Sequence, residues 1–175
     1  AANGTSRTAR AADGDNKMQS TRADFQRVDT ATDARTVALE WYKFQAGKWT
    51  ISWSDGVVVD VTYTLGSNGE ALRGTHTSRD GNSNTSLWGW DVFQRRIRHT
   101  GYGAQGNSWA ITYTKVTPTE MQGEVRGSDR DGLSMLGHVT LKKIDANTFS
   151  YRVETINGKG EKVTSTATGI RQTKE

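Results

Sequence analysis

From residue 48 to the end of the chain, apolar and polar residues alternate with a period of two, broken only by short turn signals. Lys48 to Trp53 alternates, Ser54-Asp55-Gly56 marks a turn, and Val57 to Leu65 alternates again. Because successive side chains of a β-strand point to opposite faces, this pattern predicts strands with one buried and one solvated face. The first two runs therefore form a hairpin.

Eight further runs of the same kind follow, separated by segments rich in Gly, Asn and Asp that are typical of turns. An antiparallel meander of about ten strands has to protect its edges, and closure into a barrel removes them. We therefore predict an all-β, antiparallel up-and-down barrel of about 8–10 strands, with a two-sheet sandwich as the alternative. The eight runs lie at 71–78, 85–91, 94–100, 108–116, 120–126, 133–144, 148–156 and 163–171.

Two segments of different character precede the barrel, which we place at 48–175. Residues 1–24 carry one large apolar side chain, Met18, and have no period, which predicts a polar arm. Residues 25–47 hold a helix at 29–46 and its lead-in, because Val37, Trp41 and Phe44 recur at helical spacing and Gly47 supplies a stop. A chain that begins Ala-Ala is also what we expect of a mature, exported protein, periplasmic or extracellular.

Composition excludes several classes of protein. No apolar run is longer than three residues, as in Val57-Val58-Val59, so no helical membrane span is expected, and without cysteine neither a disulfide nor a thiolate site can form. The net charge of +4 is too small to predict a nucleic-acid partner. Gln94 to His99 is the densest basic tract and Trp88, Trp90 and Phe93 lie near it, but acidic residues elsewhere dilute the field, so we expect no nucleic-acid binding.

The alternation places one set of side chains inside the barrel. Both His76 and His99 share the parity of apolar neighbours, so both imidazoles are predicted to point inward with several tyrosines and tryptophans. Such a cluster makes an amphipathic pocket suited to a small, partly aromatic ligand; the alternative is a filled core of hydrogen-bonded side chains. The predicted ligand-binding residues are Trp53, Tyr63, His76, His99, Trp109, Tyr113 and Tyr151. The predicted core adds Trp49, Ile51, Val57, Val59, Val61, Leu65, Leu72, Ile97, Ile111, Met121, Val125, Val139, Leu141, Phe149 and Val153.

Motifs for metal binding and hydrolysis are missing. The three histidines show neither His-x-His nor His-x3-His spacing, and His138 has the opposite parity to its apolar neighbours, so no metal and no cofactor is expected. No nucleophile elbow or His-Glu-x-x-His helix is present. Asp60, Glu124 and Glu154 have outward parity, which predicts solvated charges and no catalytic residue. The glycines of 101–106 have the Gly-x-Gly-x-x-Gly spacing of a dinucleotide-binding motif, but they link two predicted strands and do not begin a helix, so we do not expect them to bind a dinucleotide.

Gly47-Lys48-Trp49, directly after an aromatic helix, resembles the Gly-x-Trp that opens the barrel of lipocalins and their calycin relatives. The segments Leu87 to Ile97 and Leu141 to Tyr151 are similar to uncharacterised bacterial lipocalin-like domains of unknown function. The resemblance covers about residues 37 to 172, and it implies that Trp49 closes one barrel end under a basic side chain from the last strand. Arg171 stands at the matching place, so Gly47, Trp49 and Arg171 are the expected closure residues.

Three functions follow as hypotheses. The first is a lipocalin-like protein that binds a small or partly apolar ligand inside the barrel. The second is a structural or assembly subunit with a filled core, whose arm at 1–24 docks on a neighbouring copy to form a homo-oligomer. The third is an isomerase or cyclase that uses His or Tyr as acid or base, although no residue is assigned a catalytic role.

Overall fold

The computed structural model describes residues 28–66, 68–129 and 131–173, and these form one helix and ten strands. The predicted arm at 1–24 lies outside the described residues. The elements are α1 (Val28–Gln45), β1 (Gly47–Trp53), β2 (Val58–Leu65), β3 (Ala71–Ser78), β4 (Ser83–Asp91), β5 (Arg96–Gly103), β6 (Ser108–Val116), β7 (Glu120–Ser128), β8 (Ser134–Lys143), β9 (Thr148–Asn157) and β10 (Lys162–Arg171).

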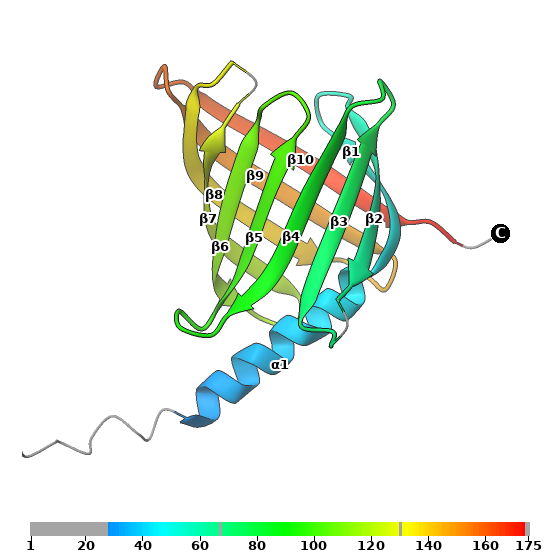
Figure 1. The fold of residues 1–175 in the computed structure, drawn as a ribbon, viewed down its shortest axis with the longest axis vertical. Helices are drawn as coiled ribbons and strands as arrows, with labels where there is room; N and C mark the ends of the chain where they lie inside the picture. Colours follow the sequence, from blue (N-terminus) through cyan, green and yellow to red (C-terminus); the bar gives the residue numbers. More distant parts are fainter. Residues whose placement is uncertain (1–27, 67, 130, 174–175) are drawn as a thin grey trace, which may run out of the picture.

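The ten strands form a closed barrel in which each strand is antiparallel to its neighbours in the sequence (Figure 1). Closure comes from β1 and β10, whose register places Trp49 opposite Arg171 and Trp53 opposite Ala167. The up-and-down barrel predicted from the alternation is confirmed, and the sandwich alternative is wrong. Closure leaves no strand edge within the barrel, which removes the risk of edge-to-edge pairing.

Five turns at one end of the barrel share one backbone pattern. In the first, the Trp53 N–H donates to the Val57 carbonyl at 2.8 Å and the Gly56 N–H donates back to the Trp53 carbonyl at 3.0 Å. Gly56 has a φ of 87°, a value that residues with a Cβ rarely adopt. This is the three-residue hairpin loop with a left-handed glycine. The same pattern joins Ser78 to Asn82, Gly103 to Asn107, Asp129 to Leu133 and Asn157 to Glu161.

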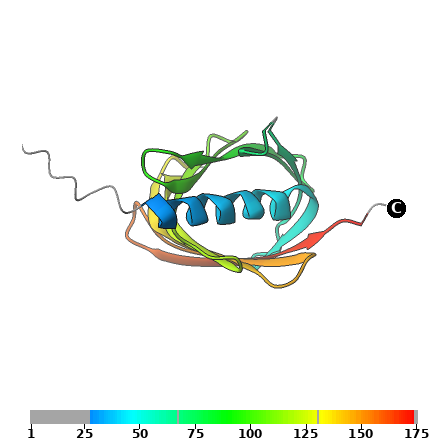
Figure 2. The same cartoon turned by 90° about the horizontal axis from the view of Figure 1, so that it is seen from below.

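The helix α1 lies across the opposite end of the barrel, which we call the helix end (Figure 2). Its apolar stripe packs against rings of the barrel: Phe44 meets Trp41 at 5.6 Å and Trp49 at 5.4 Å between ring centroids. Trp49 in turn contacts Phe149 at 4.9 Å. The Trp41 indole N–H donates to the Thr117 carbonyl at 2.7 Å, which ties the helix to the β6–β7 turn. A row of four aromatic residues therefore seals this end.

Arg171 joins the last strand to the end of the helix. Its guanidinium lies 4.3 Å from the centroid of the Trp49 ring and donates to the carbonyls of Ala46 at 2.7 Å and Phe44 at 2.5 Å. These carbonyls lie at the helix C-terminus, where a cation also interacts favourably with the helix dipole. Gly47 has to be glycine, because its φ is 119° and a Cβ there would lie 2.8 Å from Nη1 of Arg171.

The core follows the predicted parity with one exception. The other members of the predicted set are buried or packed against the buried cluster, but Val57 is 40% exposed and its assignment to the core was wrong. Val57 lies between the β1–β2 turn and the first residue of β2, Val58, so it falls just outside the strands. The strand predicted from residue 94 begins at Arg96 instead. The Asp91 side chain accepts the Gln94 N–H at 2.8 Å and Arg95 has a φ of 54°, which makes these residues a turn.

Candidate functional site

A group of aromatic and imidazole side chains occupies the barrel interior on the wall formed by β2 to β6. Ring contacts at centroid distances of 4.1 to 6.3 Å connect the members into one cluster. Five of them were predicted from the sequence, and the sixth, Trp88, was not assigned to the interior. We call this group the aromatic cluster; it comprises Tyr63 of β2, His76 of β3, Trp88 of β4, His99 of β5, and Trp109 and Tyr113 of β6.

Trp88 is the centre of the aromatic cluster. Its ring is stacked on His99 at 4.1 Å with an interplanar angle of 16°, and on Tyr113 at 5.6 Å with an angle of 15°. The register explains the first contact, because Trp88 and His99 are direct cross-strand partners. In the sequence, Trp88 was grouped with the basic tract of β5. The sequence signal that could have placed it inside is the shared parity of Trp88 and Trp90, two large aromatic side chains on one face of the strand.

The hydrogen bonds of His99 define its tautomer. The Trp109 indole N–H donates to Nε2 of His99 at 3.3 Å, so Nε2 carries the lone pair. Burial, and next the neighbouring His76, lower the pKa of His99 well below its ordinary value, so the ring is neutral. A neutral imidazole carries a proton on its other nitrogen. His99 therefore presents an Nδ1–H donor.

Several buried polar atoms of the aromatic cluster and of α1 have no hydrogen-bond partner among the described residues. They are Nδ1 of His99, Nε1 of Trp88, the hydroxyl of Tyr113, and, from α1, the hydroxyl of Tyr42 and Oε1 of Gln45. Of these atoms, Trp88 and His99 offer N–H donors, and Gln45 offers an acceptor. The two tyrosine hydroxyls can either donate or accept a hydrogen bond. Native interiors leave few such atoms unpaired, because each costs about 1–3 kcal/mol.

His76 lies on the same wall with a partner. Its Nε2 is 2.9 Å from the Ser86 hydroxyl, and its ring makes an edge contact with Tyr63 at 5.6 Å. Burial lowers the pKa of His76 to about 4, so this ring is also neutral at physiological pH. The site thus holds two uncharged histidines.

The buried Tyr63 and Tyr113 and the partly buried Tyr151 complete the electrostatic description. Burial raises the pKa of Tyr63, Tyr113 and Tyr151 above the ordinary value. The Tyr151 hydroxyl is close enough to raise the pKa of Tyr113 further, although the two hydroxyls do not have hydrogen-bond geometry. The interior therefore disfavours both a phenolate and an imidazolium. Among the described inward-facing residues the charged ones are Lys143 and Arg171, which contact Phe44 and Trp49 at the helix end.

Trp53 and Tyr151 lie apart from this wall, on β1 and β9. Their rings meet edge to face at 5.8 Å. Tyr151 still faces the aromatic cluster closely enough to affect Tyr63 and Tyr113, but no ring contact joins Trp53 to that cluster. The structure therefore brings together five of the seven predicted ligand-binding residues, places Tyr151 opposite them, and leaves Trp53 beside Tyr151.

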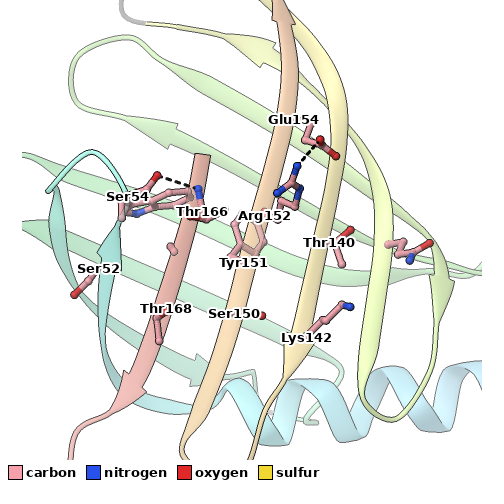
Figure 3. A pocket seen from close by; sticks show the side chains of 13 residues that line it. Ser52, Ser54, Thr140, Lys142, Ser150, Tyr151, Arg152, Glu154, Thr166 and Thr168 are labelled. Atoms are coloured by element: carbon pink, nitrogen blue, oxygen red, sulfur yellow. Dashed lines mark hydrogen bonds and ion pairs between the residues drawn. The ribbon is translucent and has the colours of Figure 1, made fainter. Parts of the chain in front are cut away.

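A groove of about 640 Å³ lies on the outer wall of the barrel over β1 and β7 to β10 (Figure 3). Its lining is rich in hydroxyl groups from Ser52, Ser54, Thr140, Ser150, Thr166 and Thr168. Its two cations are neutralised: Arg152 pairs with Glu154 at 2.8 Å and Lys142 with Glu120 at 3.1 Å. The groove is open to water and electrically balanced, so it offers less specificity than the buried aromatic cluster.

The other residues that could bind a metal ion or take part in catalysis lie far from one another. Within the described part of the chain, no group of three His, Asp or Glu side chains is arranged to hold a metal ion. His138 is exposed on the outer wall, away from His76 and His99, as its parity indicated. None of the helices within the described residues is long and apolar enough to span a membrane.

No protein-family model and no curated protein matches this chain. Among solved structures, a redesigned β-barrel is similar with a TM-score of 0.36 and 16% identity, covering 75% of this chain and 95% of its own. A de novo fluorescence-activating β-barrel gives 0.36 and 18%, covering 76% and 98%. A redesigned β-barrel bound to DFHBI gives 0.32 and 13%, covering 74% and 97%. At these scores the likeness adds nothing to the topology described above.

Proposed function

We propose that this protein binds a small, uncharged, planar molecule that carries hydrogen-bond acceptors, held against the aromatic cluster inside the barrel. The observation that carries the proposal is the set of buried, unpartnered donors on Trp88 and His99 beside the hydroxyl of Tyr113. A ligand with carbonyl or ether oxygens would satisfy these donors, and its ring would stack in the aromatic cluster.

The preference for an uncharged ligand follows from the pKa shifts. An interior that raises the pKa of tyrosines and lowers that of histidines by burial penalises either sign of charge. The same shifts weaken the isomerase or cyclase alternative. A general acid or base works best with a pKa near the operating pH, and both residue types are moved away from neutrality here.

We further propose that the barrel is lipocalin-like in its closure. The support is the arrangement of Gly47, Trp49 and Arg171, in which the arginine of the last strand covers the tryptophan that opens the first. The assembly hypothesis depends on residues 1–24, which lie outside the described residues, so it stays a prediction for sizing chromatography with and without that segment.

The first experiment is native mass spectrometry of the purified full chain, followed by calorimetric titration with acetophenone and with benzoate. These probes share a planar ring, but only benzoate is charged. We expect either a co-purified molecule of constant mass or binding of acetophenone in preference to benzoate. An adduct-free chain that binds neither probe would favour the filled-core structural subunit.

Two conservative variants localise the site. Trp88→Phe and Tyr113→Phe each leave an aromatic ring in place and remove one donor, although the ring of Phe is smaller than the indole of Trp88, and we expect about a fivefold to tenfold loss of affinity for each. Tyr102→Phe is the matched control, because Tyr102 is 72% exposed on the outer wall. Equal affinity in all three variants would refute the assignment to the aromatic cluster.

A further inference from the structure

The turn between β4 and β5 lies at the helix end of the barrel (Figure 1), and it carries two adjacent exposed apolar side chains. Phe93 is 96% exposed and Val92 is 75% exposed, the two highest values among the exposed large apolar residues of the described chain. The turn is shaped to present them: the Asp91 carboxylate accepts the Gln94 N–H at 2.8 Å, and Arg95 adopts a left-handed φ of 54°. A non-glycine residue in that conformation is uncommon.

Unpaired positive charge lies directly beside this tip. Arg95 and Arg96 follow it in the chain, are exposed, and have no carboxylate partner within 4.0 Å among the described residues. Arg98 is held only loosely, with 3.8 Å between its Nη1 and Asp91. The tip therefore combines a bare aromatic ring with guanidinium groups that are free to bind anions.

A groove of about 300 Å³ continues from the turn along the outer wall of β5 to β7. Arg96 and Arg98 on β5 and Arg126 on β7 line it, with the small side chains of Ala110 and Thr112 on the strand between them. The one acidic residue that lines it, Glu124, lies 3.9 Å from Arg126. Three guanidiniums around a small-residue strand form a site for a phosphate-type anion.

We propose that the β4–β5 turn and this arginine-lined groove dock the barrel on an anionic lipid surface. Val92 and Phe93 enter the apolar layer, and Arg95, Arg96 and Arg98 bind headgroup phosphates. Interfacial anchors combine apolar side chains with flanking cations in this way, and binding grows with the apolar area buried and with the attraction to anionic lipid. A stable protein interface needs about 1,200 Å² or more of buried surface, which two apolar side chains do not provide.

The test is flotation of the full chain with vesicles of phosphatidylcholine alone and with an equal mixture of phosphatidylcholine and phosphatidylglycerol. We expect binding to the anionic vesicles only, weakened by high salt. Phe93→Ser should weaken the binding about tenfold, and the double variant Arg95→Ser, Arg96→Ser should weaken it about fivefold for each arginine removed. The matched controls at other places on the barrel, Tyr102→Ser and Arg79→Ser, should leave it unchanged.

A second measurement reports where the tip lies. Because the natural chain has no cysteine, Phe93→Cys and Tyr102→Cys each allow a single environment-sensitive fluorophore to be attached. We expect a blue shift on anionic vesicles for the label at 93 and none for the label at 102. Absence of vesicle binding, equal binding by the Phe93 variant, or a shift at 102 instead of 93 would overturn the proposal. Arginine-dependent binding of oligo(dT), or self-association that requires Phe93, without vesicle binding would overturn it as well.

Discussion

Replacing Arg171 by methionine should destabilise the barrel by about 3–4 kcal/mol, although the side chain lies at the end of the last strand. Arg171 donates to the carbonyls of Phe44 and Ala46 and covers the ring of Trp49 at 4.3 Å. Methionine keeps part of the apolar contact with Trp49 but removes every donor. The helix C-terminus then loses its cap and the Trp49 ring loses the guanidinium that covers it, while the backbone pairing of β1 with β10 remains.

The magnitude follows from three contributions. A hydrogen bond to a charged group contributes about 1.5–3 kcal/mol, and the lower figure suits a half-buried site where water can replace the donor. Two such bonds give about 3 kcal/mol, and the cation–π contact with Trp49 adds roughly 0.5–1 kcal/mol. For a chain of this length, the melting temperature should fall by roughly 10 °C.

Urea unfolding followed by far-ultraviolet circular dichroism measures this loss. The unfolding free energy of Arg171→Lys should lie between those of the unaltered chain and Arg171→Met, because lysine keeps the charge but cannot hold both carbonyls in a planar fork. Arg152→Met is the matched control, since among the described residues Arg152 pairs with Glu154 alone, on the exposed outer wall. That change should cost less than about 1 kcal/mol. A loss below about 1 kcal/mol for Arg171→Met, or equal losses for the two arginines, would refute the closure described here.

Two further predictions concern the interior. Gly101→Ala should cost about 1–3 kcal/mol in urea unfolding, because a Cβ at Gly101 would overlap the Trp109 ring, whereas Gly89→Ala meets no neighbouring atom and should be near neutral. Stability should also fall as the pH is lowered from about 6.5 to about 4, because the folded pKa of His76 is about 4 and the unfolded chain takes up the proton first. His76→Asn should make the loss of unfolding free energy over this pH interval smaller by about 2–3 kcal/mol. The control is His138→Asn, which replaces an exposed histidine. An unchanged loss in His76→Asn would contradict the burial of His76.

Most of the strands could be predicted from the sequence because their causes are local. Alternation sets which face each residue of a strand takes, and Gly56 with its counterparts marks turns that need a positive φ. The same parity placed His76 and His99 inside. It failed for Val57, because that residue precedes the start of β2 at Val58 and parity does not show where a strand begins.

The composition of the aromatic cluster could not be predicted in the same way. Trp88 meets His99 only through the register between β4 and β5, and Tyr113 only through the stacking that this register permits. Trp53 has the same parity as the predicted ligand-binding residues and yet lies on another wall. Strand order and register around the closed barrel decide which inward side chains share a wall. Alternation with a period of two is the same in every register, so it cannot show which side chains become neighbours.

The sequence by itself determined a meander of about ten short strands with an apolar inner face, a preceding helix with an aromatic stripe, and turns that favour glycine. Only the tertiary structure decided that Arg171 also donates to the helix carbonyls of Phe44 and Ala46, and that buried donors on Trp88 and His99 have no partner among the described residues. The physical reason is the distance along the chain over which each effect acts. Backbone preference and alternation act over a few residues, whereas closure and the pairing of buried polar groups depend on residues far apart in the chain, such as Ala46 and Arg171.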